Sequence, residues 1–243
     1  MSEQAVPGPG PESRPGEEAQ AERSPWDDPR LPWEGKPERA DILCWAGIVL
    51  SGFFYLALIP FRVDLVSHHP VLGSFLNGGT ESIVTAAAYA RIGRGSLAVL
   101  IPVAVAGLMK FDILYWWAGR RWGERVVLLL FPRRKAGARY LDRVHRWGWK
   151  FSWPAMVLAP FLPFPSTIIY VITGTAGMPV TAFLLLDLVG ELLWAGTLAG
   201  LGYAIGRPVV HVVQAISHYG LWITIALVVI VVATQARSVR MHR

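Results

Sequence analysis

Two hydrophobic modules, each interrupted by glycine or proline, constrain the fold of this chain more than any other feature. The first reads FLNGGTESIVTAAAYARIGRG from Phe75, and the second reads FLPFPSTIIYVITGTAGMP from Phe161. Backbone that leaves the helical conformation inside hydrocarbon persists only where protein buries it or a wet cavity solvates it. The pair therefore predicts an integral membrane protein in which two re-entrant segments meet near the middle of the bilayer, as in transporters built from inverted repeats.

The composition supports a membrane protein and argues against a soluble domain. Hydrophobic residues make up 53% of the chain, charged residues only 16%, and the mean hydropathy is +0.40. Several apolar segments exceed the roughly 18 residues that suggest a membrane span. The net charge is +6, but the basic residues lie at the ends of these segments, where they orient membrane proteins. We therefore expect no nucleic acid as a partner.

The expected fold class is an all-α membrane protein with about four transmembrane helices and two inverted re-entrant helical hairpins. The expected spans are residues 41–61, 96–118, 180–205 and 209–232, and the expected hairpins are residues 67–93 and 151–177. The second hairpin contains four prolines, too many for a straight helix. Hairpin and following span form one repeat, so the membrane domain of residues 41–235 holds a first repeat at 67–118 and a second at 151–206.

The polar segments outside the membrane domain predict its orientation. Residues 1–40 carry no apolar period and are expected to form a disordered cytoplasmic tail. Residues 119–150 form a strongly basic linker and residues 236–243 a basic tail, both cytoplasmic by the positive-inside rule. Both termini then lie in the cytoplasm, the first hairpin enters from outside and the second from inside. Charge alone therefore predicts an inverted, multi-pass topology in the cell membrane.

Four motifs resemble those of the DedA family, also called the SNARE-associated or VTT-domain family, over about residues 41–235. They are GGTES at 78–82, DILYWWAGRRWG at 112–123, TGTAGMP at 173–179 and GELLWAGTLAGLGYAIG at 190–206. The resemblance implies movement of a lipid or lipid phosphate, such as a polyprenyl phosphate or a phospholipid, between leaflets. It departs from many bacterial members at Pro160 and Ser166, where those carry two arginines, and lacks their upstream acid near His69. The Pro-Phe-x-Pro form is closer to a eukaryotic-like branch that includes proteins resembling lipid scramblases.

Glu81 is the first candidate for handling a lipid headgroup or a proton. A carboxylate in a membrane hairpin is expensive unless it is protonated, paired or solvated, so it indicates function by default. The alternative is a structural role at the start of the helix after GGT. Asp112 is a second candidate, with a structural ion pair as its alternative, and Arg120 and Arg121 could attract an anionic headgroup.

Asp187 and Glu191 are secondary candidates, because residues four apart share one face of a helix and could form a proton-accessible pair. A structural role is the alternative for both. The hairpin backbone that would line the site is expected at Gly78, Gly79, Pro160, Pro163 and Pro165. The glycines of residues 196–206 have the small-xxx-small spacing of close helix packing.

No motif indicates an enzyme, a cofactor or a metal site. Cys44 is the single cysteine, and no pair of histidines has metal-ligand spacing. Lipid translocation is thus the preferred function, with membrane lipids as partners and a homo-oligomer left open. The alternatives are a membrane-organising or assembly factor without transport activity and an ion-coupled transporter for a small solute.

Overall fold

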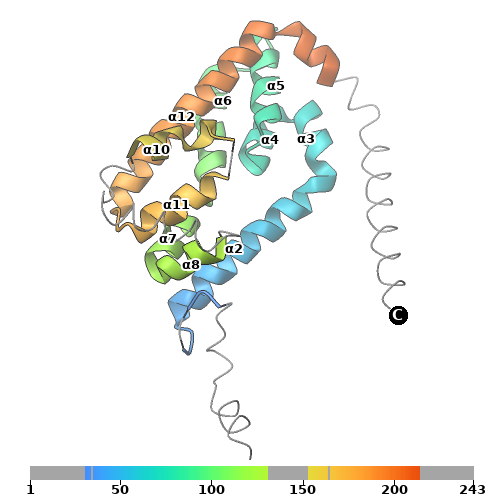
Figure 1. The fold of residues 1–243 in the computed structure, drawn as a ribbon. Helices are drawn as coiled ribbons and strands as arrows, with labels where there is room; N and C mark the ends of the chain where they lie inside the picture. The colour runs from blue at the N-terminus through green and yellow to red at the C-terminus, as the bar shows by residue number, and fades with distance from the viewer. Residues whose placement is uncertain (1–30, 34, 131–152, 164, 214–243) are drawn as a thin grey trace, which may run out of the picture.

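The computed structural model describes residues 31–33, 35–130, 153–163 and 165–213, except for the side chains of residues 128–130. Helices connected by short turns make up this part of the chain, and it contains no strand, which confirms the all-α class (Figure 1). Three helical segments are long and apolar enough to cross a membrane, namely Arg39–His68, Leu97–Trp122 and Val180–Ile205. The expected fourth span lies almost entirely outside the described residues, as does the tail of residues 236–243.

The first span is longer than the sequence predicts. It consists of α2 (Arg39–Leu58), the 3-10 turn η2 (Ile59–Phe61) and α3 (Arg62–His68), which follow one another without a loop. Pro60 lies in η2, where a residue without a backbone N–H is tolerated. Leu43, Leu50 and Phe53 on α2 are each more than 60% exposed, as expected for side chains that face lipid.

The predicted tail of residues 1–40 is shorter in the structure. Arg39 and the residue after it already belong to α2, and Trp33 packs against Trp122, with ring centroids 6.2 Å apart. The side chain of Arg125 donates a hydrogen bond to the backbone oxygen of Trp33. Residues 1–30 lie outside the described part.

The first hairpin breaks at the glycine pair. Helix α4 (Pro70–Asn77) ends at Gly78, whose φ of +60° is strained for other residues, and α5 (Thr80–Arg91) begins after Gly79. Helices α4 and α5 pack against each other. The glycine pair that the sequence analysis placed in the first hairpin thus lies between two helices.

The sequence predicts a second full span at residues 96–118, with Lys110 and Asp112 interrupting its apolar run; in the structure the helix itself breaks at these charges. Helix α6 (Leu97–Met109) ends before Lys110, and α7 (Asp112–Trp122) begins two residues later. The ammonium group of Lys110 donates to the backbone oxygens of Phe75 and Leu76, at 2.8 and 2.7 Å. These oxygens lie in the last turn of α4, where carbonyl groups have no intrahelical N–H partner. Lys110 at the break therefore caps the C-terminal end of α4.

Helix α7 extends beyond the expected start of the basic linker, to Trp122, and α8 (Glu124–Leu130) follows; residues 131–152 of that linker lie outside the described part. The second hairpin comprises α10 (Trp153–Leu158), η4 (Ala159–Phe161) and α11 (Ser166–Thr175). Helix α12 (Val180–Ile205) is the third long segment, and residues 207–213 are again helical.

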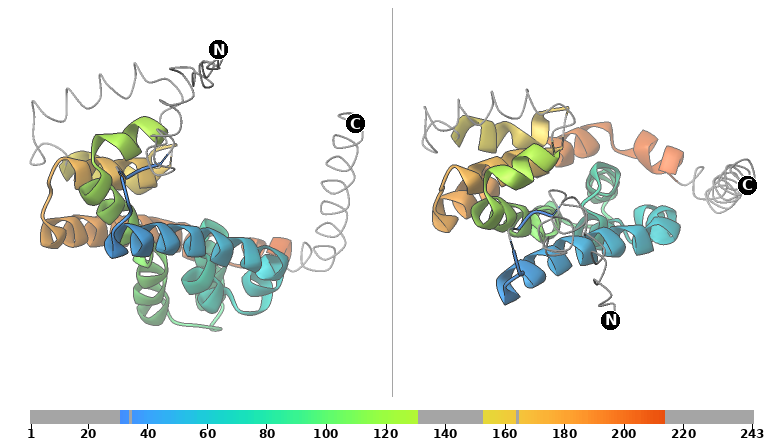
Figure 2. Two further views of the ribbon diagram at one scale, coloured as in Figure 1. Left: turned by 90° about the horizontal axis from the view of Figure 1, so that it is seen from below. Right: turned by 60° about the horizontal axis from the view of Figure 1, so that its bottom comes forward.

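Each hairpin packs its second helix on the span of the other module. Helix α5 packs along α12, and α11 packs along α7; these are the two most extensive helix pairs. In Figure 2 (left), α4 and α5 lie on one side of α12, and α7 and α8 lie on the other. This exchange of partners is what two interlocked copies of one helical unit would produce.

In both helix pairs, α7 with α11 and α12 with α5, a glycine lets the two backbones approach closely. A Cβ atom at Gly119 of α7 would lie 1.8 Å from the backbone oxygen of Val171 in α11. At Gly202 of α12 it would lie 2.2 Å from the backbone oxygen of Val84 in α5. Four residues later each helix ends at a glycine of positive φ, at positions 123 and 206. A Gly-x-x-x-Gly pair therefore both admits the opposite hairpin and terminates the span.

Candidate functional site

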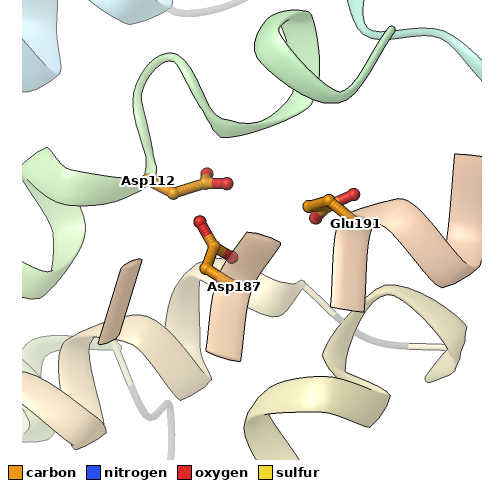
Figure 3. Close-up of side chains that lie close together, drawn as sticks. All are labelled: Asp112, Asp187 and Glu191. Carbon is orange, nitrogen blue, oxygen red and sulfur yellow. The ribbon is translucent and has the colours of Figure 1, made fainter. Parts of the chain in front are cut away.

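Three carboxylates from the two modules meet next to the break between α6 and α7. Asp112 is the first residue of α7, while Asp187 and Glu191 lie one turn apart on α12. One oxygen atom of each lies within 4.8 Å of an oxygen of both others, and the side chains point toward one another (Figure 3). We call these residues the three-acid cluster. All three residues are candidates from the sequence, but nothing in the sequence placed Asp112 beside the other two.

The cluster lies in the interior of the helical assembly. Asp187 is 2% exposed and Glu191 is 4% exposed, while Asp112 is half-buried. Oδ2 of Asp187 and Oε2 of Glu191 are buried and have no hydrogen-bond partner among the described residues. A buried acceptor without a donor is unfavourable by roughly 1–3 kcal/mol, and more if it is charged.

No ion pair in the described residues involves the three-acid cluster. Lys110 is near in sequence, but its ammonium group donates to the backbone oxygens of α4. Three carboxylates this close cannot all carry charge in a low-dielectric interior, because each repels the others and has lost its hydration. The geometry therefore suits bound protons or a hard cation with oxygen ligands.

Aromatic side chains fix the three helices around the cluster. The hydroxyl of Tyr170 on α11 donates to Oε1 of Glu191 at 3.3 Å, and its ring packs edge-on against Phe183 of α12. Trp116 of α7 also packs against Phe183 and donates its indole N–H to the backbone oxygen of Met178 at 3.1 Å. Tyr170 was not among the residues proposed from the sequence, where its signal is a phenol in the mostly apolar run STIIYVIT.

Lys110 is the second residue that sequence analysis did not select. Besides capping α4, its ammonium group lies 5.0–5.5 Å from the ring centroids of Phe54, Tyr55 and Phe111. Cation–π contacts of this kind stabilise a partly desolvated charge. Lys110 thus links α2, α4 and the broken span, and its position two residues before Asp112 was the available signal.

Glu81 lies apart from the three-acid cluster and has its own partners. Its Oε1 accepts hydrogen bonds from Nε and Nη2 of Arg62 at 2.8 and 2.7 Å, and from Asn77 at 3.2 Å. The Arg62 and Glu81 side chains are 55% and 37% exposed. Glu81 also sits in the first turn of α5, where the helix dipole favours an acid. These contacts join α3, α4 and α5.

The two arginines considered for headgroup attraction have different surroundings. Arg121 forms an ion pair with Asp41 at 2.7 Å and a second with Glu38. Trp122 also donates to Asp41, at 3.0 Å, so Arg121 and Asp41 together hold α7 against α2. Arg120 is exposed and lies beside the turn between α11 and α12, near Gly177.

We expect Asp41→Ala to lower the free energy of unfolding by about 1–3 kcal/mol, because the buried indole N–H of Trp122 loses its acceptor and Arg121 keeps only its pair with Glu38. Asp64→Ala is the matched control: it removes an acid from an exposed pair with His68, which contributes about 0–1 kcal/mol. Thermal and denaturant unfolding in one detergent would compare the two. Equal losses would mean that the Asp41 pair does not hold α2 on α7.

The hairpin residues lie in the breaks that the sequence predicts. Gly78 and Gly79 separate α4 from α5, Pro160 is in η4, and Pro165 immediately precedes α11. Pro163 is exposed in the segment between η4 and α11. These positions leave non-helical backbone in both modules.

Comparison with known proteins gives a match to one family model and to a curated relative. The family model of the VTT domain matches residues 79–204, which include α5 and the three-acid cluster. An uncharacterised membrane protein of Mycobacterium leprae (strain TN) is 29% identical over 175 residues, which cover 70% of this chain and 76% of the relative. No solved structure matches the chain.

Proposed function

Because the chain belongs to the VTT-domain family of membrane proteins, we propose that it moves a lipid or lipid phosphate between the leaflets of the cell membrane. The observation that carries this proposal is the three-acid cluster, in which buried oxygens of Asp187 and Glu191 have no hydrogen-bond partner and no acid forms an ion pair among the described residues. Ionisable groups inside a membrane domain are unfavourable and typically mark substrate or ion pathways. A membrane anchor or an assembly factor has no evident need for them.

The broken span gives the cluster a means to respond to a change of charge. Asp112 begins α7 immediately after the break, and Asp187 and Glu191 belong to the other module. Uptake of a proton or cation would remove repulsion between the modules, and its release would restore it. Such a change is the differential interaction that a two-state transporter requires. The headgroup would then cross along the polar side of the hairpins, while the acyl chains stay in the membrane.

An ion-coupled transporter for a small solute is the second candidate, and the three-acid cluster favours it as well. The two functions differ in their substrates and in their driving force. A lipid translocator exchanges labelled lipid between leaflets, whereas a solute transporter accumulates its substrate inside vesicles only when an ion gradient is applied.

The test of the proposed function is leaflet exchange in proteoliposomes. Labelled phospholipids and a labelled polyprenyl phosphate would be offered to the wild-type protein, and protein-free liposomes would give the background rate. Exchange of at least one lipid above background supports translocation. Its absence for every lipid, with protein that is folded and inserted, would move the assignment to an assembly factor.

We expect Glu81→Gln to lower this exchange by about tenfold, which corresponds to roughly 1.4 kcal/mol in the barrier. Glutamine keeps an acceptor for Arg62 but removes the charge, so the fold should persist. Asn77→Ala is the matched control, since it deletes a neighbouring hydrogen bond while leaving the Glu81 carboxylate in place. Equal exchange rates in wild type and Glu81→Gln would assign Glu81 to the structure of the hairpin alone.

A further inference from the structure

A cavity of about 890 Å³ lies away from the three-acid cluster, beside the first hairpin. It is bounded by the junction of α3 and α4, by the loop between α5 and α6, and by α6 itself. One part of its lining is polar and the other apolar, so the cavity suits an amphipathic ligand.

Arg94 provides positive charge on the polar side. It lies in the loop between α5 and α6, where Gly93 has a φ of +80° and the N–H of Arg94 donates to the backbone oxygen of Tyr89 at 2.9 Å. Within the described ranges the Arg94 guanidinium makes no ion pair and no hydrogen bond to protein, whereas Arg91 stacks over the ring of Tyr203. An arginine presents several N–H donors in a fork that matches phosphate oxygens.

Two histidines extend this polar side. His69 lines the cavity at the start of α4 and is exposed. His68 lines it too, and its Nδ1 lies 2.9 Å from the carboxylate of Asp64. Asp64 itself does not line the cavity, and no other carboxylate is among the lining residues that would face an anion at Arg94.

The apolar side consists of side chains that remain uncovered in the structure. Leu72 and Phe75 on α4 are 49% and 40% exposed, and both face the cavity together with Val103 of α6. Both helices belong to the membrane domain, where such a wall lies against acyl chains rather than water. An anion such as free phosphate would use only the arginine and leave this wall without a ligand.

We infer that the cavity is a binding site for a lipid with an anionic phosphate headgroup. The phosphate lies against Arg94 and the neighbouring histidines, and the chain lies along Leu72, Phe75 and Val103. Charge complementarity selects this occupant over a zwitterionic lipid, which brings its own cation to the phosphate. The inference rests on the proposed function only for the membrane location, because binding here is measurable whether or not the lipid is translocated.

The test is photolabelling of the full chain in nanodiscs. The probe is phosphatidylglycerol with a photoreactive group on its acyl chain, and labelled peptides are identified by mass spectrometry. We expect label on the α4 peptide that contains Leu72 and Phe75, and roughly fivefold less label in Arg94→Gln, the loss expected when one cation near an anionic lipid is removed. The same acyl probe on phosphatidylcholine should label this peptide weakly.

Arg207→Gln is the matched control, since Arg207 is an exposed arginine that does not line the cavity and follows Gly206, which packs near Arg91. Its labelling should equal that of the wild type. Val103→Trp tests the cavity independently, because it fills the apolar side and leaves Arg94 in place. Labelling of the α4 peptide should fall in this variant too. Excess inorganic phosphate should not reduce the labelling, whereas competition by it would identify an anion site without lipid.

Two outcomes would overturn the inference: equal labelling of wild type and Arg94→Gln, or equal labelling by the two headgroups. Leaflet exchange measured on the same preparations separates this inference from the proposed function. Specific labelling without exchange would retain the binding site and reject translocation. Exchange without specific labelling would do the reverse.

Discussion

Gly119→Ala should leave little folded protein, whereas Gly196→Ala should leave the wild-type amount. A methyl group at position 119 would lie 1.8 Å from the backbone oxygen of Val171, and one at position 174 would lie 2.1 Å from that of Trp116. Gly119 and Gly174 thus allow the backbones of α7 and α11 to approach closely where the two helices cross. Overpacking a core costs about 1–3 kcal/mol when side chains can yield. Here the obstacle is backbone, so the helices must separate and we expect a loss of ~3 kcal/mol or more.

Gly202→Ala should behave like Gly119→Ala, because its methyl group would lie 2.2 Å from the backbone oxygen of Val84. Gly196 and Gly200 are matched controls in the same helix, with no atom within 4 Å of the added methyl. Size-exclusion chromatography would test whether the four glycine variants are monodisperse, and thermal unfolding in detergent would measure their stability. Wild-type behaviour of both Gly119→Ala and Gly202→Ala would contradict the exchanged packing of the two hairpins.

These glycines also show which parts of the fold could be predicted from the sequence alone. Broken modules and apolar lengths predicted an all-α membrane domain, and the glycine pair of the first module does separate two helices, α4 and α5. The small-residue spacing in α12 also predicted close packing, which the structure finds at Gly202 and not at Gly196 or Gly200. A helix that is apolar on every side gives no periodic signal for the face that meets its neighbour, so the contacting glycine could not be chosen.

The sequence located the two charges at Lys110 and Asp112 but did not predict that the helix breaks there, for a related reason. Residues 97–109 and the following aromatic run together have the length of one membrane crossing. The sequence marks the break only by two charges, and neither glycine nor proline stands at it. The partners that stabilise it are the end of α4 and three aromatic rings, and they come from other helices.

Each residue of the three-acid cluster could be proposed from the sequence, but the spatial proximity of the three could not. The distance of four residues between Asp187 and Glu191 is a local property of a helix, so the pair could be predicted. Asp112 joins the pair only because α6 packs along α12 and Trp116 of α7 packs on Phe183 of α12, which brings the break beside α12; this is a tertiary property. Glu81 ranked first because it lies in a broken module, yet its partner Arg62 stands at the end of the first span and gave no local signal.

We expect Asp187→Asn to abolish most lipid exchange, by at least about tenfold, without lowering the thermal stability of the protein. Asparagine has nearly the shape of aspartate, so the packing of α12 is preserved. It carries no charge and cannot release a proton at this position. Removing one of three crowded carboxylates also relieves repulsion, so the melting temperature should stay the same or rise. Sites that hold uncompensated polar groups for function commonly show this opposition of stability and activity.

Glu191→Gln should have the same two effects, since glutamine still accepts the hydrogen bond from Tyr170. Thr197→Ala is the matched control on α12: the Thr197 hydroxyl is exposed and bonds only to Leu193 of its own helix, so neither exchange nor stability should change. Exchange and melting temperature would be measured on the same purified samples. A fall of both in Asp187→Asn would make the cluster a structural element that needs its carboxylate. An unchanged exchange rate in both acid variants would remove the three-acid cluster from the mechanism, because a site that couples charge to movement cannot function without the group that carries the charge.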